Sequence, residues 1–131
     1  MNGTTSTAAF VMGGLAIAFT PKMTGKVRIT ISGTLKNNTI NDGATVQIAF
    51  GTGTAPANGA AAAGTILTNA AQLTNAIAAN AEYPFCLSGI VGTATPLTLG
   101  TAVWFDLQQA AVTGGTATAQ RLQILLEEIQ N

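Results

Sequence analysis

The chain of 131 residues is long enough for one domain with its own core, and its composition excludes several classes of function. Only 8% of the residues are charged, against roughly 25% in an average soluble protein, and five acidic side chains balance five basic ones. Because phosphate binding needs clustered Lys and Arg, this balance argues against a nucleic-acid partner. A chain with so little charge also has weak protection against association, so we expect an assembled protein.

The first apolar segment, Ala8–Phe19, predicts a buried strand, with a signal sequence as the alternative. The segment is shorter than the roughly 20 residues that cross a bilayer, and no basic residue precedes it as in a signal peptide. Gly13–Gly14 also interrupts it. We therefore expect no membrane partner.

Two runs with a period of two follow, at Gly25–Leu35 and Thr45–Phe50. This period is typical of half-buried strands. Asn37–Asn38 and Asn41–Gly43 supply turn residues between the runs, because Asn, Asp and Gly tolerate left-handed backbone angles. The two runs are predicted to pair as antiparallel strands. Their inward side chains are predicted to be Val27, Ile29, Ile31, Val46, Ile48 and Phe50.

The middle of the chain is rich in small residues. Gly51–Gly64 is a loop by composition. Ile66–Ala81 fits two readings: its alanines allow a helix, whereas its repeated Asn and Thr weaken one and favour a short strand at Ile66–Leu67 with irregular chain after it. Phe85–Val91 is a further predicted strand, with Gly89 as a bulge, and Gly92–Gly100 is a loop.

The last third predicts two more strands. In Thr101–Leu107, Val103 and Phe105 define the inner face, so Trp104 and Asp106 point outward. A turn at Gly114–Gly115 leads into a strand over Ala117–Ile129, whose end is predicted to fray at its two glutamates. About six to eight strands with long Gly-rich connections predict one all-β domain over residues 1–131, an antiparallel β-sandwich of jelly-roll-like form.

The residues that usually perform catalysis are scarce. The sequence has no histidine and one cysteine, which removes the commonest general base and the usual zinc ligands. Cys86 lies in an apolar run, where a free thiol behaves as a small hydrophobe. Asp42, Glu82 and Asp106 are far apart in the chain and have ordinary roles in a turn, at a strand start and on a strand face. We predict no enzyme activity, no cofactor and no metal.

Exposed apolar side chains are the remaining candidates for a function. An outward Trp104 favours a contact between subunits, with core burial and ligand contact as the alternatives. Leu125 breaks the alternation of the last strand, and the first apolar segment offers further side chains. The predicted oligomer or shell contacts are Trp104, Leu125, Phe10, Val11 and Leu15.

Several phrases of the sequence resemble a β-rich domain of tailed-bacteriophage virion proteins. The likeness spans residues 10–120 and is a likeness of turns and strand pattern. It is carried by Gly25–Gly33, Asn37–Thr39, Asp42–Gly59, Tyr83–Gly89, Gly100–Leu107 and Ala111–Thr118.

This resemblance implies a virion component of the structural, decoration or fibre type, and such domains commonly form trimers. A small domain without a shaft or attachment module favours a capsid decoration protein that binds the major capsid protein or another virion protein and stabilises the head. The alternative is a tail-associated or fibre-associated module that recognises a host surface glycan through the Gly51–Gly64 and Gly92–Gly100 loops.

Overall fold

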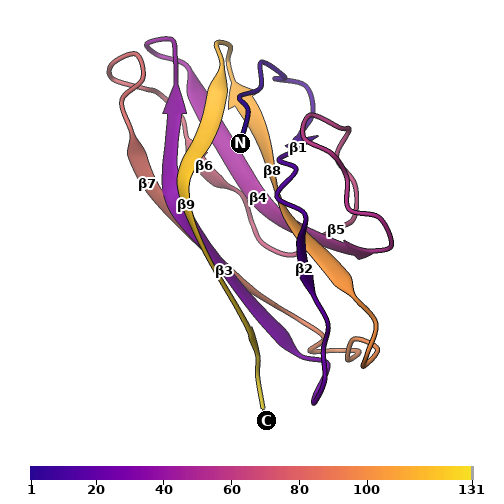
Figure 1. Ribbon diagram of the computed structural model, residues 1–131. Coiled ribbons are helices and arrows are strands. Elements are labelled where there is room, and N and C mark those ends of the chain that lie inside the picture. The colour runs from indigo at the N-terminus through magenta and orange to yellow at the C-terminus, as the bar shows by residue number, and fades with distance from the viewer. Residues whose placement is uncertain (131) are drawn as a thin grey trace.

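The computed structural model describes residues 1–130, and every regular element in this part of the chain is a β-strand (Figure 1). The strands are β1 (Val11–Met12), β2 (Ile17–Phe19), β3 (Val27–Asn37), β4 (Gly43–Thr52), β5 (Thr65–Ile66), β6 (Ala71–Leu73), β7 (Tyr83–Val91), β8 (Val103–Val112) and β9 (Ala117–Glu128). They form two antiparallel sheets, which confirms the predicted all-β sandwich. The predicted domain ends at Asn131, which lies outside the described residues.

The smaller sheet has the strand order β7-β3-β9, and the larger has the order β1-β8-β4-β5, with β2 also paired to β8 and β6 also paired to β4. β1 and β2 follow one another along β8, so they make one interrupted edge of the larger sheet. β5 and β6 make the opposite edge along β4 in the same way. The split edges explain why the described residues form nine strands where the sequence predicts about six to eight.

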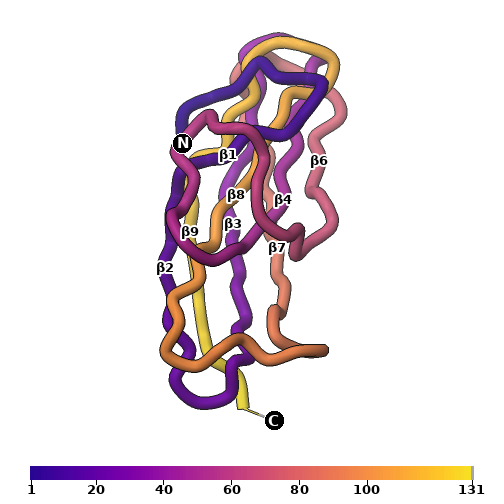
Figure 2. The backbone as a smooth tube through the Cα atoms, turned by 90° about the vertical axis from the view of Figure 1, so that its right-hand side faces the viewer, coloured from indigo at the N-terminus to yellow at the C-terminus, as the bar shows by residue number. Residues whose placement is uncertain are grey.

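The predicted pairing of the Gly25–Leu35 run with the Thr45–Phe50 run is wrong, because the two runs belong to opposite sheets. The connection after β3 crosses the sandwich. It starts at the fully buried side chain of Asn37, whose Nδ2 donates to the carbonyl oxygens of Gly43 at 2.8 Å and Gly114 at 2.9 Å. The chain also crosses between the sheets after β2, β6, β7 and β8, and Figure 2 shows these crossings at the two ends of the molecule.

The main core lies between the two sheets and follows the predicted alternation. Most inward side chains of β3, β4 and β8 are almost completely buried, whereas Phe50 near the end of β4 is half-buried. Each fully buried apolar side chain of this size stabilises the fold by roughly 1.5–3 kcal/mol. The largest of them are Val27, Ile29, Ile31, Val46, Ile48, Phe105 and Leu107.

The ambiguous segment 66–81 contains no helix, and the predicted short strand at Ile66–Leu67 is found as β5, one residue earlier. The chain after it, which was predicted to be irregular, also contains the strand β6. The predicted bulge at Gly89 is wrong, because the β3–β7 register runs without a shift from Val27–Val91 to Leu35–Tyr83. Gly89 meets a different requirement: a Cβ there would lie 2.7 Å from Cγ of Leu67.

The predicted strand Ala8–Phe19 forms only in two pieces. Between β1 and β2 the chain leaves the ladder, where Gly14 (φ 71°) and Ala16 (φ 49°) adopt left-handed backbone angles. The segment is an edge of the sheet rather than an interior strand. Met12 is fully buried, but most of its neighbours are half-buried or exposed.

Candidate assembly surface

Trp104 lies on the outward face of β8, as predicted, but a loop of the same chain covers it. Only 6% of its surface is exposed, and it forms a second small core with Met12 and Ala49. Its indole Nε1 donates to the carbonyl of Thr52 at 3.2 Å. A Cβ at Gly64 would lie 2.4 Å from the indole, so the loop can close over the ring only with glycine there. Trp104 therefore holds the Gly51–Gly64 loop against the sheet.

Asp106, two residues further on β8, fastens the N-terminal segment in a similar way. Its fully buried carboxylate accepts the N–H groups of Gly14 and Leu15, both at 2.9 Å, and that of Leu107 at 2.8 Å. Burial raises the pKa of this carboxyl, while the three N–H donors act in the opposite direction. Asp106 lies on the outward face of β8, as predicted, but the N-terminal segment buries it there.

The three predicted contact residues that lie in the N-terminal segment are half-buried against their own chain. Phe10 lines a pocket of about 240 Å³ together with Thr45 and Ala110. Val11 pairs with Gln109 in β1, and Leu15 packs against the main core. Their role in contacts between copies stays a prediction.

Leu125 is the most exposed of the predicted contact residues, with 58% of its surface accessible. It lies on β9, which is an edge strand of the smaller sheet. Its neighbour Ile124 points to the opposite face of that sheet and is still 40% exposed. Two adjacent large apolar side chains on an edge strand leave both faces of that strand apolar and open.

A bulge divides β9 into two halves. The β3–β9 register shifts between Ser32 and Thr34, and Arg121 takes a left-handed φ of 52° there. Gly33 is required opposite the bulge, because a Cβ would lie 2.7 Å from the carbonyl oxygen of Gln120.

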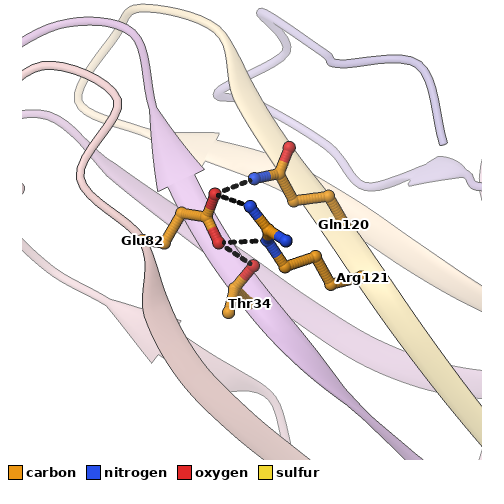
Figure 3. Close-up of polar contacts among 4 residues, drawn as sticks. All are labelled: Thr34, Glu82, Gln120 and Arg121. Carbon is orange, nitrogen blue, oxygen red and sulfur yellow. Dashed lines mark hydrogen bonds and ion pairs between the residues drawn. The ribbon is translucent and has the colours of Figure 1, made fainter.

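The bulge directs Arg121 to a polar cluster on the outer face of the smaller sheet (Figure 3). Arg121 Nε and Nη2 donate to the two carboxylate oxygens of Glu82 at 2.7 and 3.2 Å. Gln120 Nε2 donates to the same carboxylate at 2.7 Å, and the Thr34 hydroxyl also donates to it at 3.1 Å. The hydrogen bond from Arg121 is the main cause of the lowered pKa of Glu82. Sequence reasoning missed this cluster, because nothing in the spacing marks the bulge.

The two halves of β9 differ in how their free edge is covered. Before the bulge, Ala117 exchanges two main-chain hydrogen bonds of 2.9 Å with Thr4, and the Ala119 N–H donates to Gln109 Oε1 at 3.4 Å. After the bulge, residues 1–130 provide no strand on this side. We call Leu122–Glu128 the open half of β9.

The main-chain groups at the free edge of the open half follow from one hydrogen bond. The Ile129 N–H donates to the carbonyl of Lys26 at 2.9 Å, so this residue faces β3. Antiparallel ladders alternate between residues that face the partner strand and residues that face away. The N–H and C=O groups of Leu122, Ile124 and Leu126 therefore point away from β3.

The end of β9 is held rather than frayed, which corrects the sequence prediction for Glu127–Glu128. Arg28 Nη1 lies 2.9 Å from Glu127 Oε1. The Glu128 carboxylate accepts N–H groups of the segment between β2 and β3, including those of Lys22 at 2.8 Å and Thr24 at 2.6 Å. These hydrogen bonds lower the pKa of Glu128 to about 2.

Cys86, which the sequence predicts to behave as a small hydrophobe within an apolar run, is exposed on β7. It lines a pocket of about 320 Å³ at the edge where β6 and β7 meet, together with Tyr83 and Leu73. Among the described residues, no three Cys, Asp or Glu side chains gather where they could hold a metal ion. The same residues contain no helix that could span a membrane.

Comparison of the chain with known protein families, curated proteins and solved structures found no match.

Proposed function

We propose that this chain is a non-enzymatic structural protein that assembles with copies of itself. Its specific role in this proposal is that of a decoration protein on the head of a tailed bacteriophage, where it binds the shell of the major capsid protein. The virion location and a trimeric assembly come from the resemblance described above. The contact chemistry comes from the surface of the chain itself.

The open half of β9 is the observation that carries the proposal. Its exposed Ile124 and Leu125 lie on a strand whose outer main-chain groups have no partner strand in the described residues. Unpaired edges of this kind readily add a strand from another chain. The low charge of the sequence, 8% of all residues, supports the same conclusion, because little repulsion opposes contact between copies.

The fastening of the loops suits a protein that bears load. Three side chains attach three segments to the sandwich. Trp104 holds the Gly51–Gly64 loop, Asp106 holds the N-terminal segment, and Glu128 holds the segment before β3. A rigid body of this kind adds buried apolar area at the joints of a shell without deforming, at roughly 25 cal/mol for each Å².

Immunogold electron microscopy of purified virions with antibodies against this chain tests the location. Regular labelling over the head is the expected result, with preimmune serum as the control. Labelling confined to the tail would replace the decoration role by the tail or fibre role, and unlabelled particles would exclude a virion protein.

A further inference from the structure

We infer that two copies of the chain join through the open half of β9, side by side and antiparallel, with a two-fold axis at Ile124. The two smaller sheets then become one continuous sheet across the contact. This inference rests on the self-association in the proposed function and identifies the surface that performs it.

Main-chain hydrogen bonding limits which residues of two β9 strands can lie opposite each other. Two edge strands form a ladder only where residues with outward-facing N–H and C=O groups lie opposite each other. A two-fold axis at Ile124 places Ile124 opposite its own copy and Leu122 opposite Leu126 of the second copy. All of these residues direct their main-chain groups away from β3, as the hydrogen bond from Ile129 to Lys26 establishes.

The side chains also match in this register. On the inner face, Leu122, Ile124 and Leu126 form one row, so every cross-strand pair there is apolar. Directly opposed apolar side chains stabilise an antiparallel pair by roughly 0.2–1 kcal/mol each. A two-fold axis at Leu125 would instead place Leu122 opposite Glu128 of the second copy, whose carboxylate is already held by Thr24.

The charges on the outer face agree with the same register. In this register Arg121 lies opposite Glu127 of the second copy, while each side chain keeps the ion pair of its own chain, Arg121 with Glu82 and Glu127 with Arg28. Both side chains are accessible to a partner, with 71% of Arg121 and 43% of Glu127 exposed. Like charges would meet nowhere along the seam.

The bulge and the N-terminal segment limit the contact to this half. The bulge at Arg121 bends β9, and Thr4 already occupies the edge at Ala117. The ladder therefore ends at Leu122 in each copy and cannot extend along the whole strand. A two-fold contact also closes on itself, so it joins copies in pairs, and a trimer would need a second surface.

Cysteine pairs in a Cys86→Ser background test the register. Residues 123 and 125 face each other across the two-fold axis as a non-hydrogen-bonded pair, whose Cα atoms lie about 4.5 Å apart, within the range of a disulfide. A mixture of Gln123→Cys chains and Leu125→Cys chains is expected to form covalent dimers under mild oxidation, while each variant alone does not. Dimers of either variant alone would overturn the register, and no dimer in any sample would overturn the β9 contact.

An independent test introduces a charge at the axis. Ile124→Asp places two carboxylates opposite each other and is expected to raise the dissociation constant at least about ten-fold in sedimentation velocity experiments. Ile77→Asp is the matched control, because Ile77 is 79% exposed and lies outside β9. Circular dichroism of both variants checks the fold. Equal dissociation constants for the two variants would overturn the contact.

The outcomes separate this inference from the proposed function. A wild-type chain that stays monomeric at all concentrations would overturn self-association and, with it, the β9 contact. A wild-type chain that associates, but is unaffected by Ile124→Asp and forms no cysteine-linked dimers, would overturn the β9 contact alone. The virion location is decided separately by the immunogold labelling.

Discussion

The main-chain nitrogen of Thr24 donates a hydrogen bond to Glu128 Oε1 at 2.6 Å, and this bond ties the end of β9 to the segment before β3. The same carboxylate accepts the N–H groups of Lys22 and Gly25 at 2.8 and 2.9 Å. The Thr24 hydroxyl donates in turn to the carbonyl of Ile129 at 2.7 Å. The last strand is thus fastened to the segment between β2 and β3 by an ionised group, so its attachment depends on pH.

Glu128→Gln is expected to change the acid dependence of stability. Main-chain hydrogen bonds, that from Lys22 first, lower the pKa of Glu128 from 4.5 to about 2. Because the pKa of Glu128 is lower in the folded state than in the unfolded state, its stabilisation is fully present above pH 4.5 and is lost as the pH falls toward about 2. The variant should show a lower urea midpoint at pH 7 and a flatter decline between these pH values.

The control for this experiment is Glu127→Gln, which removes the neighbouring carboxylate but leaves the Thr24 segment bound. Urea denaturation of the three proteins from pH 7 to pH 2 makes the comparison. A Glu128→Gln profile that coincides with the wild-type profile would show that the carboxylate does not stabilise this end.

Asp106→Asn is expected to destabilise the fold by about 1–3 kcal/mol at neutral pH. The amide can still accept hydrogen bonds from Leu15 and Leu107 through its oxygen, but its nitrogen then faces the N–H of Gly14. Two donors facing each other in a buried site leave both without an acceptor. Urea denaturation gives the free energy of unfolding, with Glu127→Gln as the exposed acid-to-amide control; equal values for the two variants would contradict the prediction.

Trp104→Ala is expected to destabilise the protein by about 3–5 kcal/mol, because it empties the small core under the loop. The loop between Gly51 and Gly64 should then be cleaved faster by proteinase K. Trp104→Phe keeps much of the apolar volume and should retain both the loop protection and the association between copies. If Trp104→Phe dissociates the oligomer while its fold is intact, Trp104 contacts a second copy directly.

The sequence allowed the strands to be predicted but not their partners. Alternation at Val27, Ile29 and Ile31 identifies an inner face, yet the same pattern results whether the next strand lies beside it or across the core. The buried side chain of Asn37 holds the start of the crossing through its bonds to Gly43 and Gly114, and the contact with Gly114 joins residues far apart in the chain.

The candidate surface was also only partly predictable, because alternation shows which face a side chain is on but not what covers that face. Leu125 breaks the strand pattern in the sequence, and it is indeed exposed. Trp104 was correctly assigned to the outward face, but its cover is a loop of small residues whose position no periodicity encodes. The carboxylates of Asp106 and Glu128 are bound by main-chain N–H groups, and every residue type except proline supplies such a donor, so the sequence carries no signal for them.

Two substitutions at Arg121 distinguish the contribution of backbone strain to stability from that of the ion pair. Arg121 has a φ of 52°, a conformation that costs residues with a Cβ roughly 1–2 kcal/mol and glycine almost nothing. Arg121→Ala and Arg121→Gly both remove the ion pair with Glu82, which is an exposed contact of little net stability. Of the two variants, Arg121→Gly is therefore expected to be more stable by about 1 kcal/mol, measured as the difference in unfolding free energy in urea. The opposite order would mean that position 121 leaves the left-handed conformation in solution, and the covered and open halves of β9 would then no longer be divided at this residue.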